Sequence, residues 1–367
     1  MQKTHQYRVG YSAKVIIERG ALFKLQDLIN QDKKLSRAPK YLFIVDRNFN
    51  LHHQDLLNKV LTNLKQEYAV MLVDVGPKLK SLAGVESLYK NLNEHNVKRD
   101  SVIIVVGGGV LCDTVGFTSA TYMRGICTIN IPTTMMSCAD PVMGKVAVDH
   151  LSQKNLVGSW FFPYLTLVDP SLIKKDMPRY FNTGISEIIK SALISDKNTF
   201  NKLEKDIKIL MKGDEEIIKK YIEMSIKIKI KCVKGDEQDV YGRHSKLSLG
   251  HNLADVLESL APPTTITHGE AVALGMIFAA SVNNIIEHTK LSEELLNKTI
   301  QLIREAGLPI QIPFLIEKEQ IVEGLLRSKK SCNNAIVLVL AKDYGRIETK
   351  EVDPAVINMA SETVLKR

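Results

Sequence analysis

A series of five short apolar runs in the first 170 residues restricts the fold of this chain more than any other feature. The runs are bounded by glycine, proline or aspartate and lie at residues 40–46, 68–75, 101–109, 127–134 and 165–170. Continuous apolar runs of this length are typical of strands buried on both faces, and helical stretches separate them. We therefore expect an α/β unit in which helices cover a Rossmann-like parallel sheet, an architecture that commonly binds nucleotides.

The apolar pattern changes its period near residue 180. Apolar residues three and four apart, as in amphipathic helices, occur in segments 184–194, 217–233, 249–260, 269–286 and 291–307. One β-like stretch, residues 334–341, interrupts them. We expect an α/β domain at residues 1–178 and a mostly α-helical domain at residues 179–367, with the functional site in the cleft between them.

The composition excludes several classes of protein. The chain has 367 residues, of which 45% are hydrophobic and 25% charged, so it can bury a sizeable core. It has no run of eighteen apolar residues, and its amino terminus lacks a secretory signal pattern, so we expect a cytoplasmic protein. The five cysteines form no CxxC pair, which argues against a disulfide framework and a thiolate zinc site and predicts buried thiols.

The formal net charge of +8 favours anionic partners. The lysines are spread along the chain and form no basic arm, so small phosphorylated ligands fit better than nucleic acid. Most of these lysines are expected to belong to the solvated surface.

A glycine-rich turn follows the apolar residues 101–106. Three glycines, at residues 107–109, precede Asp113 and a helix-like stretch. Glycines at a strand end let the backbone approach a pyrophosphate, whose charge the amino terminus of the next helix favours. The pattern is not GxGxxG, and a plain turn is an equal alternative. Asp46, at another strand end, can bind a ribose together with Asn48 or can cap a helix.

His251 lies on the polar side of a predicted helix. The apolar stripe of this helix consists of Leu249, Leu253, Val256, Leu257 and Leu260. His251, Asp255 and Glu258 fall on the opposite side, so His251 is not expected to be a core residue of its own helix. From this segment alone, a solvated histidine is the simpler interpretation.

His268 lies at the start of another predicted helix. Thr267 and Glu270 fit a capping box, which places His268 in the first helical turn. A histidine at this position can point into a cleft, and Gly269 beside it allows close approach.

Glu187 and Lys190 lie three residues apart on the polar side of a third predicted helix, where a surface ion pair is a common alternative interpretation. A carboxylate and two neutral imidazoles with an open position are the usual form of a catalytic zinc centre. Glu187, His251 and His268 are therefore candidate ligands of one metal.

Six separated motifs occur in the same order as in a known family. They are GGGVLCDTVGFTSATYMRG, IPTT, QKNLVGSW, SEIIK, LGH and THGEAVALGM. Through them the sequence resembles, over nearly the whole chain, 3-dehydroquinate synthase and its relatives, the sugar-phosphate cyclases. The resemblance implies an amino-terminal domain that binds NAD, a helical domain that binds zinc or cobalt, and a homodimer.

The resemblance also implies roles for individual residues. It implies Glu187, His251 and His268 as the metal ligands. It places NAD at Asp46, Asn48, Lys80, Gly107, Gly108, Gly109, Asp113, Thr133, Thr134 and Asp140. The substrate and its phosphate would contact Lys145, Lys154, Asn155, Lys190 and Lys229, with Arg124 reaching across from the neighbouring subunit. Lys329 and Lys330 resemble a further segment that contacts phosphate.

The chain departs from the family pattern on the substrate side. Asp255 stands where dehydroquinate synthases carry a second histidine, and Ser248 replaces an asparagine. The arginine that would bind the substrate carboxylate falls at His244, or at Arg243 if the loop contains a one-residue insertion. Pro77 stands where a ribose-side glutamate is common.

These departures predict the family's chemistry on an altered substrate. Our leading hypothesis is a sugar-phosphate cyclase whose substrate lacks the carboxylate, such as sedoheptulose 7-phosphate. True 3-dehydroquinate synthase is its nearest rival, since other motifs fit the dehydroquinate and deoxy-inosose branches. A metal-dependent NAD dehydrogenase of the glycerol-dehydrogenase type and a non-catalytic relative remain as alternatives.

Overall fold

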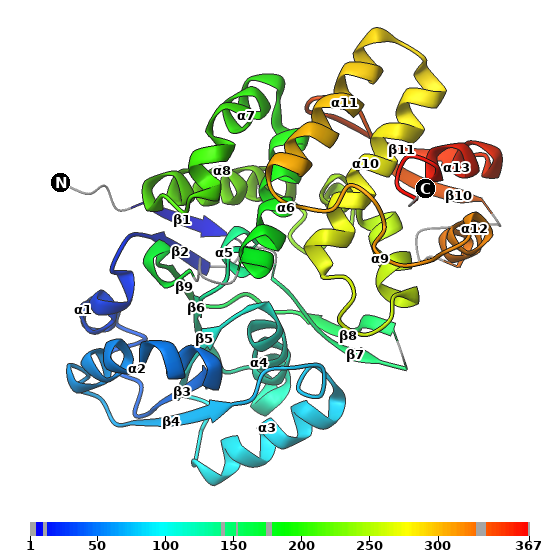
Figure 1. Cartoon of the computed structure of the whole chain (residues 1–367). Helices are drawn as coiled ribbons and strands as arrows, with labels where there is room; N and C mark the ends of the chain where they lie inside the picture. Colours follow the sequence, from blue (N-terminus) through cyan, green and yellow to red (C-terminus); the bar gives the residue numbers. More distant parts are fainter. Residues whose placement is uncertain are drawn as a thin grey trace. The chain divides into compact units, whose positions relative to one another are not determined.

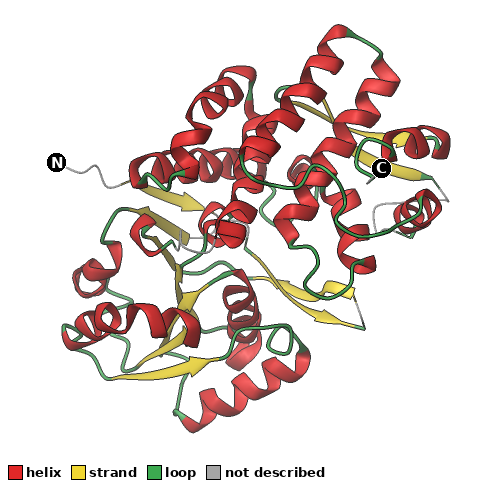
Figure 2. Cartoon of the chain, in the orientation of Figure 1, coloured by secondary structure: helices red, strands yellow, loops and turns green. Residues whose placement is uncertain are grey.

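The computed structural model describes residues 5–9, 13–140, 144–151, 153–173, 178–327 and 335–365. The chain folds into two compact units, Met1–Lys174 and Lys175–Arg367 (Figure 1). The first unit contains the large sheet, and the second consists mainly of helices (Figure 2).

A seven-stranded sheet forms the centre of the first unit. The strand order is β1-β2-β9-β6-β5-β3-β4, and only β1 pairs antiparallel with its neighbour. The strands are β1 (His5–Val9), β2 (Ala13–Ile17), β3 (Tyr41–Asp46), β4 (Tyr68–Val73), β5 (Val102–Gly107), β6 (Cys127–Pro132) and β9 (Leu165–Val168). A separate antiparallel hairpin consists of β7 (Lys145–His150) and β8 (Gln153–Trp160).

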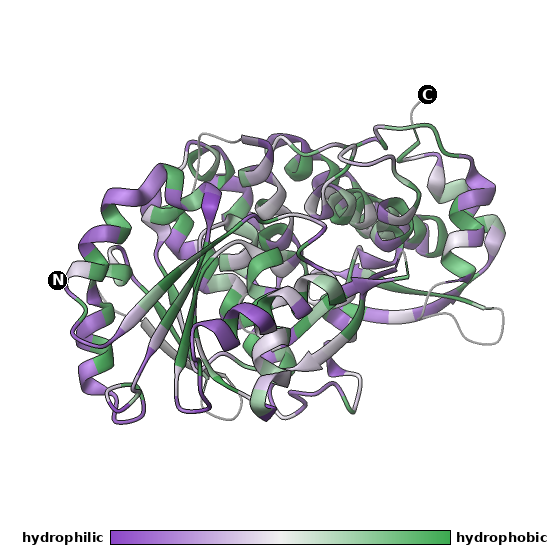
Figure 3. Cartoon of the chain, turned by 90° about the horizontal axis from the view of Figure 1, so that it is seen from below, coloured by the Kyte–Doolittle hydropathy of each residue, from purple (hydrophilic) through white to green (hydrophobic). Residues whose placement is uncertain are grey.

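Helices cover both faces of this sheet. They are η1 (Ala21–Lys24), α1 (Leu25–Gln31), α2 (Arg47–Thr62), α3 (Leu82–Glu94), α4 (Gly109–Thr121), η2 (Tyr122–Arg124), α5 (Met135–Ala139) and η3 (Pro170–Leu172). Tyr41, Phe43 and Val45 of β3 pack in one cluster with apolar residues of α1 and α2. Leu42 and Ile44 point to the other face, toward α3 and α4. Figure 3 accordingly colours the strands mostly hydrophobic.

All five strands expected in this unit are present, as β3, β4, β5, β6 and β9, so the prediction of a helix-covered parallel sheet is confirmed. Strands β1 and β2 and the β7–β8 hairpin were not predicted. The side chains of β8 are exposed or half-buried along its whole length, so this strand has no continuous apolar run that would identify it.

The second unit is mostly helical, as predicted. Its helices are α6 (Pro178–Ser195), α7 (Lys197–Met211), α8 (Glu215–Val233), η4 (Arg243–Ser248), α9 (His251–Leu260), α10 (His268–Glu287), α11 (Lys290–Glu305), α12 (Lys318–Leu326) and α13 (Pro354–Ser361). The β-like stretch is one strand of a hairpin formed by β10 (Ile336–Asp343) and β11 (Arg346–Val352). The polar strand β11 was not predicted.

Helix α10 is the central helix of this unit. Its length and apolar composition would suit a membrane-crossing helix, but 78% of its most apolar stretch is buried inside the protein, as in a core helix. The apolar stripe predicted for α9 is buried except at its end, where Leu260 is 42% exposed because the helix terminates there.

The cysteines of the described residues are free thiols. Cys138 is fully buried, whereas Cys112, Cys127 and Cys232 are only partly buried, so the prediction of buried thiols is correct for one of these four. Cys332 lies outside the described residues.

Candidate metal centre and nucleotide-binding edge

Three helices of the second unit each contribute one metal-ligand side chain to a common point. Glu187 lies on α6, His251 begins α9 and His268 begins α10. One carboxylate oxygen and one nitrogen of each ring all lie within 4.8 Å of one another. The two imidazole rings have centroids 5.3 Å apart. The structure therefore brings together the three residues that the family resemblance implies as ligands.

Glycines allow these helices to approach closely. A Cβ atom on Gly275 of α10 would lie 1.8 Å from the carbonyl oxygen of Gly250, the residue before His251. A Cβ atom on Gly269, the residue after His268, would lie 1.9 Å from the carbonyl oxygen of Thr183 on α6. Only glycine permits these contacts, which hold the first turns of α9 and α10 beside α6.

Glu187 is a buried carboxylate with two ammonium partners. Lys190 donates to its Oε1 at 2.8 Å, and Lys229 of α8 donates to its Oε2 at 2.9 Å. Burial acts to raise the pKa of Glu187, but the charges of Lys190, Lys229 and His251 outweigh it and hold the pKa well below its usual value. The alternative of a surface ion pair for Glu187 and Lys190 is wrong, because both residues are at most 3% exposed.

Both histidines have one ring nitrogen occupied by an acceptor. Nδ1 of His251 lies 3.3 Å from the carbonyl oxygen of Leu249, and Nδ1 of His268 lies 2.9 Å from Oε2 of Glu258. These oxygens can only accept, so in the neutral form of each ring the hydrogen lies on Nδ1 and the lone pair on Nε2. His251 is half-buried, with its side chain 21% exposed, and it is grouped with Glu187 and His268 and not surrounded by solvent alone.

The pKa of His268 is raised above its usual value. Desolvation of the ring acts to lower this pKa, but the hydrogen bond and the charge of Glu258 outweigh it. Glu258, assigned only to the polar side of its helix, was missed as the partner of His268. Its position seven residues after His251, two helical turns along the same side, was the available signal.

This donor set fits a zinc or cobalt ion. Two neutral imidazoles and one ionised carboxylate supply three ligands, and a fourth position stays open for an oxygen of a substrate. Within the part of the chain that the structure describes, Glu187, His251 and His268 form a group whose ligand atoms could hold a metal ion.

The carboxyl ends of the parallel strands in the first unit form an edge of the kind at which nucleotides bind. Consecutive connections from β3 lead first to β4 on one side and then to β5 on the other, so the strand order reverses beside β3. Ligands of open parallel sheets bind outside the carboxyl ends of strands at such a switch point. Asp46 ends β3, and Gly107 ends β5 beside it.

Most of the predicted NAD residues lie along this edge. A Cβ atom on Gly107 would lie 3.2 Å from Cβ of Asp46, and one on Gly108 would lie 3.0 Å from Cγ2 of Thr134. Thr133 donates its backbone N–H to the carbonyl oxygen of Gly107. The carboxylate of Asp46 accepts from the backbone N–H of Asn48 at 2.9 Å, so it caps α2.

Lys80 and Asp113 form an ion pair of 2.6 Å in the same unit. Burial raises the pKa of Asp113, Lys80 acts against this rise, and the nearby carboxylates of Asp140 and Asp149 add to it. Gly109 begins α4 and has open space around its Cα, and Asp140 is exposed at the end of α5.

Of the residues of the first unit that the resemblance assigns to the substrate, three lie on the β7–β8 hairpin and Arg124 lies on η2. Lys145 lies at the start of β7, with its ammonium 5.2 Å from the centre of the Trp160 ring. Lys154 and Asn155 are exposed on β8, where the backbone N–H of Asn155 donates to Asp149. Arg124 follows α4, whose 13 residues span about 20 Å, so it lies far from the Gly107 end of the sheet.

Two of the positions that depart from the family pattern, His244 and Arg243, contact backbone carbonyl oxygens. His244 is 2% exposed, and its Nε2 lies 2.7 Å from the carbonyl oxygen of Asp236. The guanidinium of Arg243 donates to the carbonyl oxygen of Lys234 at 2.9 Å. Asp255 is exposed on α9, Ser248 is half-buried, and Pro77 is exposed. Lys329 and Lys330 lie outside the described residues.

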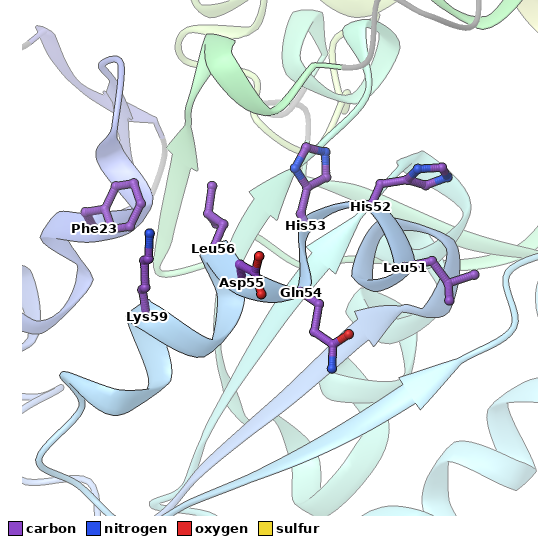
Figure 4. A pocket seen from close by; sticks show the side chains of 8 residues that line it. All are labelled: Phe23, Leu51, His52, His53, Gln54, Asp55, Leu56 and Lys59. Carbon is purple, nitrogen blue, oxygen red and sulfur yellow. The ribbon is translucent and has the colours of Figure 1, made fainter.

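A hollow of about 460 Å³ beside α2 contains none of the predicted site residues among those that line it (Figure 4). It lies where α2 is kinked at His53, and Phe23 of η1 contributes to its wall.

The sheet edge of the first unit and the candidate metal centre of the second are the features of a class of proteins that pairs a nucleotide-binding sheet with a helical metal centre.

Known proteins resemble the chain over nearly its full length. Residues 70–183 match the family profile described as 3-dehydroquinate synthase N-terminal, and residues 184–331 match 3-dehydroquinate synthase C-terminal. The 3-dehydroquinate synthase of Rippkaea orientalis is 31% identical, over 92% of this chain and 91% of its own length. The chain belongs to the 3-dehydroquinate synthase family.

Two solved structures show the same fold. A 2-deoxy-scyllo-inosose synthase complexed with carbaglucose-6-phosphate, NAD+ and Co2+ matches with a TM-score of 0.86 at 22% identity, over 99% of this chain and 100% of its own. The 2-epi-5-epi-valiolone synthase of Streptomyces hygroscopicus subsp. jinggangensis 5008, with NAD+ and Zn2+ bound, matches with a TM-score of 0.82 at 21% identity, over 99% of each chain.

Proposed function

We propose that this protein is an NAD- and metal-dependent sugar-phosphate cyclase, a lyase that eliminates phosphate from a phosphorylated sugar and closes a carbocycle by an intramolecular aldol reaction. The observation that carries the proposal is the convergence of Glu187, His251 and His268, in a member of the 3-dehydroquinate synthase family. The two buried lysines bonded to Glu187 add cationic groups at the same point.

The proposed reaction begins with oxidation of a ring alcohol to a ketone, which acidifies the neighbouring C–H bond and allows phosphate to leave. The ketone is then reduced again, the ring opens and the aldol reaction closes the carbocycle. Bound NAD would supply the hydride acceptor and donor, and a bound zinc or cobalt ion would polarise the oxygen that is oxidised.

The protein's own residues would bind and orient the substrate. Glu187, His251 and His268 would hold the metal, with Nε2 of each imidazole presented by the hydrogen bond at Nδ1. Lys190 and Lys229 are fixed by Glu187 and buried, which favours them as anchors for a phosphate or a developing oxyanion. Lys145, Lys154 and Asn155 are proposed as further substrate contacts on the basis of the family resemblance.

NAD is proposed to bind at the carboxyl edge of the sheet. The support comes from the switch point between β3 and β5, the glycines that begin α4, and the NAD+ of the two solved cyclases. Gly107, Gly108 and Gly109 would face the pyrophosphate, and Asp46 with Asn48 the ribose. Lys80, Asp113, Thr133, Thr134 and Asp140 complete the proposed site.

The substrate is proposed to be a sugar phosphate without a carboxylate, such as sedoheptulose 7-phosphate. The loop position expected to hold a carboxylate-binding arginine carries the buried His244, and the guanidinium of Arg243 is bonded to the backbone. The relatives named 3-dehydroquinate synthase, at 31% identity, favour the heptulosonate phosphate as the second candidate.

A phosphate-release assay with NAD and added zinc or cobalt tests this proposal on three substrates: sedoheptulose 7-phosphate, the heptulosonate phosphate and glucose 6-phosphate. We expect phosphate release from the first substrate without net NADH accumulation, and its loss in Glu187→Gln. Release from the heptulosonate alone would identify a true dehydroquinate synthase. Net NADH formation without release of phosphate would instead indicate a dehydrogenase. The absence of turnover with all three substrates would indicate a non-catalytic relative.

Assembly and location are also proposals. We propose a cytoplasmic homodimer in which Arg124 contributes to the site of the partner, because this residue lies far from the nucleotide-binding edge of its own unit. Sedimentation analysis, followed by mixing of Arg124→Ala with Glu187→Gln subunits, tests this. Activity restored in the mixed dimer would support a shared site. A mixed dimer without activity would contradict it.

A further inference from the structure

Glu258 connects two of the helices that build the candidate metal centre. It lies on α9, seven residues after His251, yet its Oε2 is 2.9 Å from Nδ1 of His268 at the start of α10. The Glu258 side chain is only 6% exposed. A buried carboxylate requires a hydrogen-bond donor, and Nδ1 of His268 supplies one. The same hydrogen bond restricts the orientation of the His268 ring.

The contact determines which nitrogen of His268 can bind a metal. A carboxylate accepts but does not donate, so the hydrogen of a neutral His268 ring stays on Nδ1 and the lone pair on Nε2. The negative charge also makes the ring a better electron donor at Nε2. Either tautomer would be available to a ring without this partner, and rotation of the ring would be less restricted.

The two histidines are supported unequally. His251 has a neutral acceptor, the carbonyl oxygen of Leu249, at 3.3 Å from its Nδ1. His268 has a charged acceptor at 2.9 Å, and its side chain is also the more exposed of the two, at 41% against 21%. The more exposed ligand therefore depends more on its partner for a fixed orientation.

We propose that Glu258 is a positioning residue that fixes the tautomer and orientation of His268 and so strengthens binding of the divalent metal. This inference rests on the metal centre of the proposed function. A purely structural role, in which Glu258 only ties α9 to α10, would affect the stability of the fold but would leave the affinity of the folded protein for metal unchanged.

The test compares Glu258→Ala, Glu258→Gln and the control Glu323→Gln. Glu323 is a surface residue on α12, 60% exposed and paired with Arg327, so its substitution removes one charge away from the centre. Zinc affinity is measured by competition with a chromophoric chelator, ligand geometry by the visible absorption of the cobalt-loaded protein, and folding by thermal unfolding of the metal-free protein.

We expect zinc affinity about 10- to 100-fold weaker in Glu258→Ala, with an altered cobalt spectrum, and unchanged affinity in Glu323→Gln. Glu258→Gln keeps an acceptor for Nδ1 but loses the charge, so its affinity should lie between those of Glu258→Ala and the wild type. Affinity within twofold of the wild type in both Glu258 variants would overturn the inference. Should the alanine variant fail to fold, the glutamine variant decides by the same criterion.

Failure of this inference can be distinguished from failure of the proposed function. Wild-type protein that binds zinc and releases phosphate, with Glu258 variants of equal zinc affinity, would contradict only the role of Glu258. Wild-type protein that binds neither zinc nor cobalt would overturn both.

Discussion

Glu187 and Lys229, 42 residues apart, are joined by a hydrogen bond of 2.9 Å, and neither side chain is more than 2% exposed. A second link between the same helices, 2.8 Å between the hydroxyl oxygens of Ser191 and Ser225, lies one helical turn away. The candidate metal centre is therefore built on a buried polar contact between α6 and α8, and its carboxylate stays ionised because two ammonium groups neutralise it.

Replacement of Lys229 by methionine should destabilise the metal-free protein by about 3 kcal/mol, because it leaves Glu187 with one fewer cationic partner in a buried position. The matched control is Lys227→Met, since Lys227 lies on the same helix and is 53% exposed. That variant should stay within about 0.5 kcal/mol of the wild type. Urea unfolding with chelator present measures both values, and equal stabilities would contradict the account.

Alanine at Gly275 should weaken metal binding and destabilise the fold by about 1–3 kcal/mol. Its Cβ would lie 1.8 Å from the carbonyl oxygen of Gly250, so α9 and α10 must separate and carry His251 away from His268. Helix propensity alone predicts that alanine would stabilise α10, whereas the close contact with Gly250 predicts that it destabilises the fold, so the sign of the change in stability distinguishes the two effects.

Gly76→Ala serves as its control, because a Cβ there meets nothing within 4 Å. Chelator competition and urea unfolding give the two readouts. A Gly275→Ala protein with wild-type zinc affinity would show that helix spacing does not set the ligand geometry.

Local patterns were sufficient to predict much of the architecture and part of the candidate site. Continuous apolar runs identified β3 and β5 because both faces of these strands are buried, and the polar sides of α9 and α6 indicated His251 and Glu187. The burial of Glu187 was not predictable from the sequence of α6. The apolar stripe of α6 does not indicate whether a second helix covers its polar side.

Tertiary contacts decided the remainder. Asn252 of α9 is buried because its amide bonds to the backbone of Val337 and Val339 in β10, a partner that its own segment does not reveal. The partnership of Glu258 with His268 likewise crosses between helices, so spacing along one helix could indicate only the side on which Glu258 lies.

The stability contributed by Asp206 should depend on pH. Its carboxylate accepts from Lys220 at 2.5 Å and from the hydroxyl of Tyr221 at 2.9 Å. The hydrogen bond of Lys220 lowers the pKa of Asp206, burial acts against this, and Tyr221 lowers it further. Because the pKa is lower in the folded state, the contribution is complete above the unfolded value near 3.9 and disappears as pH falls through the folded value.

Asp206→Asn should therefore cost about 1–2 kcal/mol at pH 7, and the difference from wild type should shrink below about pH 4. Glu216→Gln, an exposed substitution on the first turn of α8, controls for loss of one charge. Urea unfolding over a series of pH values measures the difference. A difference that grows as the pH falls would contradict the assigned direction of the pKa shift.

Arginine at His244 should destabilise the protein by about 3 kcal/mol or more and should not create activity on the heptulosonate phosphate. The ring of His244 is 2% exposed and its Nε2 lies 2.7 Å from the carbonyl oxygen of Asp236, so a longer side chain there would overpack the site and bring a charge into a buried position. Arg243→Ala, which removes an exposed guanidinium that donates to the carbonyl oxygen of Lys234, should cost less than about 1.5 kcal/mol.

Thermal unfolding and phosphate release on the two substrates check this pair of variants. A stable His244→Arg protein with increased turnover of the heptulosonate phosphate would show that this loop can present a carboxylate-binding cation to the substrate.

The most direct test of the central claim is anomalous X-ray diffraction at the zinc edge from crystals grown with zinc and NAD. We predict one strong peak at about 2.0–2.2 Å from a carboxylate oxygen of Glu187 and from Nε2 of both His251 and His268. A zinc peak bound elsewhere, with these three side chains pointing away from one another, would contradict the proposed metal centre and the reaction built on it.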